Sequence, residues 1–191
     1  MDSWKLILNS DQINEIVNNI ADKIDKAYGD NDIVLMCILK GAAYFTIELS
    51  NKLKTNHSLE FVQSKSYNGQ KRNKNNIIYN FNPEKLIGKK IIIIDELLDS
   101  GHTLLNVKNE LIKYIPKDDI ITCVAMNKKF CSKDKEKICL ANIVGIDVPD
   151  VWLVGYGLDH YEQYRNLKKV YAVPKINDED KTLDDLIIFG S

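Results

Sequence analysis

The chain has 191 residues, of which 45% are hydrophobic and 28% are charged, and its formal net charge is −1. This length suits one compact domain with a sizeable core, and the even charge balance argues against a general nucleic-acid-binding protein. No apolar run approaches the ~20 residues that span a bilayer, and the first residues lack a signal-peptide pattern, so we expect no membrane association and a cytoplasmic location.

Hydrophobic periodicity and turn residues predict alternating helices and strands. The first helix has Ser10 as a suitable N-cap, an isoleucine-rich stripe at helical spacing, and Gly29 at its end. Residues 33–39 are continuously apolar, as expected of a strand buried on both faces. In chain order we expect a helix over 10–28, a strand over 33–39, a helix over 42–54, strands over 59–65, 77–81 and 90–95, a helix over 103–114, and strands near 119–126, 139–146, 151–155 and 169–173.

Alternation of strands and helices through the middle of the chain implies parallel βαβ units, so the predicted fold class is α/β with a central parallel sheet flanked by helices. Ligands of such sheets bind outside the carboxyl ends of the strands. The chain ends depart from the alternation and are expected to form a small hood lobe there. We expect a single domain over 1–191 with its core at about 30–145. Four residues that follow predicted strand ends should meet at this edge: Lys40, Lys65, Asp95 and Lys128.

Residues 91–103 are the most informative stretch, because four isoleucines lead directly into Asp95 and Glu96, and Asp99 and a small-residue turn follow. We expect a buried strand that ends in an acidic loop and then a helix. Carboxylates at a strand tip can bind hydroxyls or a metal, and free N–H groups at the helix start over 100–103 suit a phosphate. A ligand with both a diol and a phosphate, such as a ribose 5-phosphate, fits this arrangement.

Other chemistries find less support in the sequence. An acidic strand end also occurs in P-loop NTPases, but that interpretation requires a G-x-x-x-x-G-K-[ST] loop, which the chain lacks. The four cysteines form no C-x-x-C pair and the three histidines are scattered, so the sequence predicts neither a zinc site nor a redox centre. A solvated acidic turn is the remaining alternative, and the hydrophobic strand before it counts against that.

Residues 91–103 resemble the phosphoribosyl-pyrophosphate (PRPP) motif of type I phosphoribosyltransferases, and the closest match is the hypoxanthine-guanine branch of that family. The resemblance extends over about 33–174. The family's first pyrophosphate loop resembles Leu39-Lys40-Gly41, and its mobile hood loop resembles Lys65-Ser66-Tyr67 with the basic stretch to residue 76. The family's purine-reading lysine corresponds to Lys128. Its C-terminal signature resembles Val148-Pro149-Asp150 together with 154–159 and Tyr164-Arg165.

The resemblance implies the type I phosphoribosyltransferase fold and a purine-salvage reaction. A 6-oxopurine, hypoxanthine and/or guanine, would take the 5-phosphoribosyl group of PRPP, giving IMP or GMP and pyrophosphate, with Mg2+ as cofactor. It also implies a homodimer or homotetramer, while the even charge balance leads us to expect no nucleic-acid partner. Two alternatives stay open, namely a transferase specific for xanthine or another base, and a PRPP-sensing regulatory protein that binds nucleic acid.

The resemblance also implies residue roles, beginning with Asp99, which would take the proton of purine N7. PRPP ribose and phosphate would be bound by Asp95, Glu96, Asp99, Ser100, Gly101, His102 and Thr103. Pyrophosphate would be bound by Lys40, Gly41, Ser66, Tyr67 and Arg165. The purine would be bound by Lys128, Ile143, Val144 and Asp150. Magnesium would be bound by Asp95, Glu96 and Asp150, partly through PRPP and water.

The chain departs from the family pattern at two places. The usual acidic pair is Glu followed by Asp, whereas this chain has Asp95 followed by Glu96. Ile143 stands where we expect the family's aromatic ring that stacks on the purine, with Trp152 as another candidate for covering the base. The preferred base therefore stays open. In the family, the peptide bond between Lys40 and Gly41 can be cis.

Overall fold

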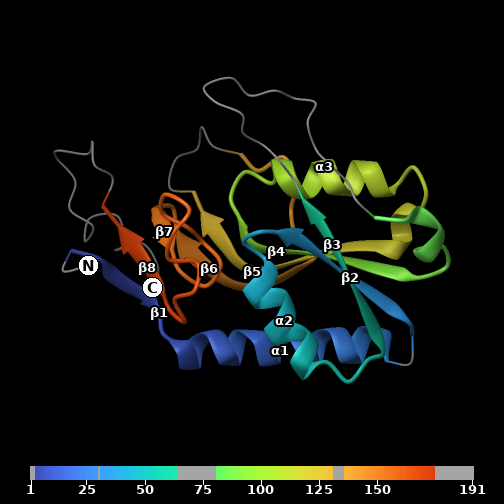
Figure 1. Cartoon of the computed structure of the whole chain (residues 1–191), viewed down its shortest axis with the longest axis horizontal. Coiled ribbons are helices and arrows are strands. Elements are labelled where there is room, and N and C mark those ends of the chain that lie inside the picture. The colour runs from blue at the N-terminus through green and yellow to red at the C-terminus, as the bar shows by residue number, and fades with distance from the viewer. Residues whose placement is uncertain (1–2, 30, 64–80, 131–135, 175–191) are drawn as a thin grey trace.

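The computed structural model describes residues 3–29, 31–63, 81–130 and 136–174, and their strands form two sheets (Figure 1). Neighbouring strands of the five-stranded sheet, in the order β3-β2-β4-β5-β6, all run parallel. The carboxyl ends of its strands therefore meet at one edge. The strands of this sheet are β2 (Ile33–Leu39), β3 (His57–Gln63), β4 (Lys90–Leu98), β5 (Ile120–Lys129) and β6 (Ile143–Pro149).

A smaller antiparallel sheet is built from the two ends of the described chain. Its order is β1-β8-β7, so a strand from the start of the chain pairs with one from its end. In Figure 1 it lies at the left, beside β6. The predicted fold class is confirmed, including the hood lobe from the chain ends. The strands of this sheet are β1 (Lys5–Leu8), β7 (Trp152–Val154) and β8 (Val170–Val173).

Helices cover both faces of the central sheet, and each face has its own apolar cluster. One cluster joins α1 and α2 to side chains such as Leu35 and Ile94, and the other joins α3 to side chains such as Met36 and Ile93. These neighbours fall in different clusters because successive strand residues point to opposite faces. The helices are α1 (Ser10–Tyr28), α2 (Ala43–Lys52) and α3 (His102–Leu111), with 3-10 turns at Pro83–Lys85 and Lys117–Asp119.

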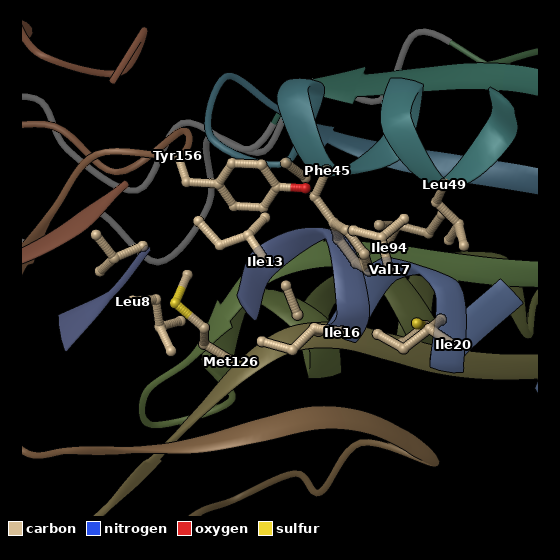
Figure 2. Packing of buried hydrophobic residues seen from close by; sticks show 14 of the residues in the cluster. Leu8, Ile13, Ile16, Val17, Ile20, Phe45, Leu49, Ile94, Met126 and Tyr156 are labelled. Carbon is tan, nitrogen blue, oxygen red and sulfur yellow. The ribbon is translucent and has the colours of Figure 1, made fainter. Parts of the chain in front are cut away.

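Two contacts made by Tyr156 connect the hood to this core. Figure 2 shows the ring of Tyr156 lying between Ile13 of α1 and Phe45 of α2. The Tyr156 hydroxyl donates a hydrogen bond of 2.7 Å to Glu48 of α2, and burial, together with this bond, raises the pKa of Tyr156. The segment after β7 is thus fixed to the helical layer. Within the described ranges, no helix has both the length and the apolar character needed to cross a membrane.

Several predicted boundaries are corrected by the structure. The N-cap of α1 is Asn9 and not Ser10, because the Asn9 side chain accepts from the Gln12 N–H while the Gln12 side chain accepts from the Asn9 N–H. β3 starts at His57, two positions before the predicted residue 59, and β6 starts at Ile143 and not near 139. The predicted loop over 65–76 and most of the predicted strand over 77–81 lie outside the described residues.

Two further corrections concern charged residues that the sequence placed in loops. β4 continues past its predicted end at Asp95, through Glu96 to Leu98, because its ladder with β5 still pairs Leu98 with Asn127. β5 continues to Lys129, so Lys128 also lies on a strand. The acidic pair and the lysine therefore project from the rigid sheet, and only Asp99 lies in the loop.

Candidate active site

Two neighbouring carboxylates lie near the carboxyl end of β4. Asp95 and Glu96 are half-buried, and the Glu96 N–H donates to Asp95 Oδ1 at 3.1 Å. Burial and the adjacent Glu96 carboxylate raise the pKa of Asp95 well above its ordinary value. Burial also raises the pKa of Glu96, although the guanidinium of Arg165 acts in the opposite direction. The pair is therefore an acidic centre that a cation or a hydroxyl-rich ligand would stabilise.

Two glycines close over Glu96. A Cβ atom on Gly41 would overlap the Glu96 carboxylate, and a Cβ atom on Gly157 would overlap the Gly41 carbonyl oxygen. The backbone after β2, the backbone after β7 and the acidic side chain are therefore in direct contact. The cis peptide bond of this loop joins Leu39 to Lys40 and not Lys40 to Gly41.

The elbow between β4 and α3, which we define as residues 98–103, presents an open helix start. Gly101 is the N-cap of α3 and has a left-handed φ of 85°, which glycine adopts without a steric penalty. No side chain caps this helix, and its first turn carries no acidic residue. His102 instead bonds through Nδ1 to Ser100 Oγ at 2.8 Å. The positive end of α3 is thus available to an anion.

Lys128 reaches from β5 to the elbow. Its side chain is 10% exposed, and its Nζ lies 3.1 Å from Asp99 Oδ2, in an ion pair with a carboxylate that is 55% exposed. An ammonium has three N–H donors, so the bond to Asp99 leaves two for a ligand. The structure therefore brings together the predicted catalytic carboxylate and the predicted purine-reading lysine.

Two predicted purine-binding residues are not brought to this place. Register pairs Lys128 with Val148 at the carboxyl end of β6, whereas Ile143 pairs with Cys123. Five residues of strand separate these positions, roughly 16 Å at 3.3 Å per residue. Ile143 packs against the core beside α1, and Val144 packs on the opposite face.

The loop after β6 is a better neighbour for a base held by Lys128. Asp150 follows Pro149 at the end of β6 and is half-buried, so it lies at the carboxyl edge as predicted. Trp152 begins β7 and is 48% exposed, which leaves ring surface uncovered. The predictions for Ser66 and Tyr67 lie outside the described residues.

A charged network occupies the hood next to Glu96. Arg165 donates through Nη1 to the Gly157 carbonyl at 2.8 Å and pairs through Nη2 with Asp159 at 2.7 Å, while its buried Nε has no hydrogen-bond partner in the described part of the chain. Lys40 pairs with Glu162 at 2.7 Å, and Glu162 also lies 3.4 Å from Arg165. The two predicted pyrophosphate-binding cations therefore share one acidic partner.

The backbone of this hood segment is unusual. Left-handed φ angles occur at Tyr156, Tyr161, Glu162 and Tyr164 among the non-glycine residues, and at two glycines of the same segment. Such conformations are costly for L-residues and concentrate where a loop has to present particular groups. In the sequence, repeated glycines and aromatic residues are the features that mark this segment as unusual.

Sequence reasoning gave no role to three residues that the structure places here. Asp159 pairs with Arg165 and raises the pKa of Glu96 by its charge, and Glu162 joins the two cations. Lys137 donates to carbonyl oxygens of the elbow. Asp159 lies inside the signature quoted above, so that motif could have identified it. Glu162 and Lys137 carry no comparable signal in a chain rich in charge.

The acidic centre suits a divalent cation that is shared with a ligand. Glu96 Oε2 is buried and has no hydrogen-bond partner among the described residues. Within the same ranges, no group of three or more His, Cys, Asp and Glu side chains is arranged to hold a metal ion by itself. Mg2+ usually keeps several waters and takes one or two carboxylates together with substrate phosphates, so these residues fit it.

Comparison with known proteins agrees with this geometry. Residues 3–160 match the phosphoribosyl transferase domain model. The hypoxanthine-guanine phosphoribosyltransferase of Aquifex aeolicus is 35% identical over 172 residues, which cover 88% of this chain and 94% of that protein. A solved hypoxanthine-guanine phosphoribosyltransferase of Bacillus anthracis is 29% identical with a TM-score of 0.73, covering 89% of this chain and 98% of that one.

A second solved structure, a hypoxanthine phosphoribosyltransferase of Staphylococcus aureus, has a TM-score of 0.77 at 26% identity and covers 89% of this chain and 91% of its own. The family-model match spans the central sheet together with β1 and β7 of the hood. The chain belongs to the phosphoribosyltransferase family and groups with its hypoxanthine-guanine members.

Proposed function

We propose that this protein is a purine-salvage enzyme that transfers the 5-phosphoribosyl group of PRPP to hypoxanthine or guanine and releases pyrophosphate. The observation that carries the proposal is the position of Asp99, which lies between the acidic pair of β4 and the open start of α3 and is paired with Lys128. A carboxylate there is beside both the sugar and the base. The family assignment supports the same reaction.

The sugar and its phosphate would bind along the elbow. Asp95 and Glu96 would accept hydrogen bonds from the ribose hydroxyls, and their negative charge would stabilise the cationic sugar that forms as the bond to pyrophosphate breaks. The N–H groups at the start of α3 would hold the 5-phosphate. The elbow residues proposed to surround this phosphate are Ser100, Gly101, His102 and Thr103.

The base would bind between Lys128 and the loop after β6. As purine N9 bonds to the anomeric carbon, pyrophosphate leaves with the electron pair of the broken C–O bond, and Asp99 takes the proton from N7. Lys128 would donate to O6, which distinguishes 6-oxopurines from adenine because adenine has an amino donor there. Asp150 would contact the base edge, and Trp152 is the proposed stacking ring.

Pyrophosphate would bind beside Gly41. Lys40 and Arg165 supply positive charge from the loop after β2 and from the hood, and an arginine fork can bind two phosphate oxygens at once. Ser66 and Tyr67 belong to the same proposal as parts of a loop that closes over the reacting centre and excludes water. When bound, Mg2+ would neutralise charge on the departing pyrophosphate.

The cation would be held by the carboxylates that face the acidic centre. Asp95 and Glu96 are proposed to contact it or its waters, because their charges repel one another without it. Asp159 is a stronger third candidate than Asp150, since its charge acts on Glu96 directly. Chelation should therefore weaken PRPP binding as well as turnover.

We also propose a single domain that assembles as a homodimer or homotetramer in the cytoplasm. The location follows from the substrates, since PRPP and nucleotides are highly charged and do not cross membranes unaided. Light scattering of the purified protein, with and without PRPP, tests the assembly.

The function is tested by offering hypoxanthine, guanine, xanthine, adenine and uracil separately with Mg-PRPP and identifying the nucleotide formed. We expect IMP or GMP to dominate. Product from xanthine alone would support the other-base alternative. Salt-sensitive binding of RNA or DNA without any nucleotide product would contradict the enzyme assignment and support a regulatory role.

A further inference from the structure

One short segment lies against the back of the elbow and binds three of its consecutive carbonyl groups. Lys137 Nζ donates to the carbonyl oxygen of Leu98 at 3.1 Å and to that of Asp99 at 3.0 Å. The next residue, Ile138, donates its N–H to the carbonyl oxygen of Ser100 at 3.0 Å. A single side chain and its neighbouring backbone thus fix the direction of three successive peptide groups.

Peptide geometry then fixes the direction of the N–H groups that follow these carbonyls. Only the Leu39–Lys40 bond is cis among the described residues, so the elbow peptides are trans. The C=O and N–H of a trans peptide point in opposite directions. Because the carbonyls of Leu98, Asp99 and Ser100 point toward 137–138, the N–H groups that follow them must point the other way.

Two of those three N–H groups, those of Ser100 and Gly101, donate to no other residue of the described chain. The N–H groups of His102 and Thr103, at the start of α3, do not donate either. Gly101 is left-handed and the helical residues that follow it are right-handed, and successive N–H groups in such alternating conformations can form an anion-binding concavity. A Cβ on Gly101 would stand 2.6 Å from the Cys139 carbonyl oxygen, so the supporting segment packs tightly behind this residue.

Lys137 is placed to act through the backbone and not on a ligand. It is half-buried, and its ammonium lies 4.5 Å from the centre of the Phe130 ring. Burial lowers the pKa of Lys137, while the charge of Asp99 opposes that shift. A hydrogen bond to a carbonyl polarises its peptide and strengthens the N–H on the other side as a donor. A half-buried cation behind the elbow therefore improves anion binding in front of it.

We propose that Lys137 is a positioning residue for the sugar-phosphate site, because it fixes the elbow carbonyls and so aims the opposite N–H groups at the 5-phosphate of PRPP. This inference rests on the proposed function for the identity of the anion. It predicts an effect on phosphate affinity that is separate from effects on the base or on pyrophosphate.

The test compares Lys137→Met, Lys137→Arg and the matched control Lys129→Met. Methionine keeps the apolar stem but removes the donors, and arginine keeps a charged fork that can reach two carbonyls. Lys129 is 67% exposed and pairs with Asp147, so its removal changes the local charge equally without touching the elbow. The measurements are KM for PRPP and for the base, kcat, and calorimetric Kd for ribose 5-phosphate and for pyrophosphate.

Lys137→Met should raise the PRPP KM and the ribose 5-phosphate Kd at least tenfold, about 1.4 kcal/mol. The KM for the base and the Kd for pyrophosphate should stay within about twofold, Lys137→Arg should recover most of the loss, and Lys129→Met should resemble the parent protein. Phe130→Leu, which loosens the lysine without changing the elbow, should shift the same two constants in the same direction by a smaller factor.

Unchanged PRPP KM and ribose 5-phosphate affinity in Lys137→Met would overturn the inference, as would a loss of kcat and melting temperature with these affinities intact. If the parent protein makes no nucleotide from any base, the proposed function fails separately. The role of Lys137 is then decided by amide hydrogen exchange at Ile138, whose N–H is bonded to the Ser100 carbonyl; this exchange should become faster in Lys137→Met and would overturn the inference if it did not change.

Discussion

Lys128 on β5 and Asp99 in the elbow form an ion pair in which the lysine is buried and the carboxylate is mostly exposed, with 3.1 Å between Nζ and Oδ2. The pairing joins two neighbouring strand ends, because Leu98 and Asn127 are register partners. The exposed carboxylate can be hydrated without its partner, whereas the buried ammonium depends on the carboxylate. The pair therefore orients the lysine and leaves Asp99 accessible to a ligand.

Asp99→Asn is expected to lower kcat by at least about 100-fold, the range typical of losing a positioned proton acceptor. Asparagine keeps an oxygen that can accept from Lys128, so the fold and the site should persist. The Kd for PRPP should accordingly stay within about threefold. Rapid-quench turnover and calorimetry measure the two quantities, and a large loss of PRPP affinity with little loss of turnover would contradict the assigned role.

Lys128→Met is expected to raise the KM for hypoxanthine or guanine by about tenfold or more, since a polar group that meets the purine O6 is lost. The PRPP Kd should change little, because the remaining Asp99 carboxylate is solvated. Discrimination against adenine should fall. Lys129→Met on the same strand is the control for charge. Equal base preference in the parent protein and Lys128→Met would rule out this role.

The extent to which the sequence predicted this site has a physical explanation. Runs of apolar residues identify strands buried on both faces, so β2 was predicted at its observed bounds. The same reasoning ended β4 and β5 too early, because charged residues at 96 and 128 look like loop, although pairing with neighbouring strands continues past them. Strand length at the carboxyl edge depends on partners distant in sequence.

Similar causes explain why Ile143 was assigned to the wrong place and why Lys137 was given no role. Ile143 was assigned to the base by its position in a motif. The register of β6, however, puts it five strand residues, roughly 16 Å, from Val148, the residue that pairs with Lys128. Lys137 could not be found, because its contacts are with carbonyl groups that any residue carries. Residue-type patterns report side-chain chemistry, while backbone contacts appear only in the folded chain.

Asp95→Asn is expected to raise the melting temperature of the ligand-free protein at pH 7 by at least about 2 °C. The pKa of Asp95 is raised by burial and by Glu96, so this carboxyl binds more protons in the folded state than in the unfolded state. Its contribution therefore favours folding at low pH and is lost as pH rises from about 4 toward the raised pKa. The variant should be more stable only above that range.

Melting curves of Asp95→Asn from pH 4 to pH 8, recorded with chelator, test this expectation. Asp118→Asn, an exposed carboxylate at the amino end of β5, provides the control. A benefit that is independent of pH, or a loss of stability at pH 7, would show that repulsion within the acidic pair is not the cause. PRPP affinity should fall in Asp95→Asn, as expected where stability is sacrificed for binding.

Glu162→Gln is expected to lower the Kd for pyrophosphate about two- to threefold. Glu162 holds both Lys40 and Arg165, and its bond to Lys40 lowers the pKa of Glu162, so an incoming anion has to replace a charged partner. Exposed pairs contribute little, which limits the effect. Glu110→Gln, which removes the corresponding pair with Lys113, is the control. Weaker binding in Glu162→Gln would indicate that the glutamate orients the cations.

Gly157→Ala and Gly88→Ala separate backbone strain from packing at the acidic centre. Both glycines have left-handed φ angles, 97° and 78°, so alanine at either should cost about 1–2 kcal/mol in conformation. A Cβ on Gly88 meets nothing, whereas one on Gly157 overlaps the Gly41 carbonyl and should cost roughly 1–3 kcal/mol more. Urea denaturation measures both costs. Because Gly41 lies against Glu96, pyrophosphate affinity should fall in Gly157→Ala alone, and equal behaviour of the two variants would show that the loop after β2 adjusts freely.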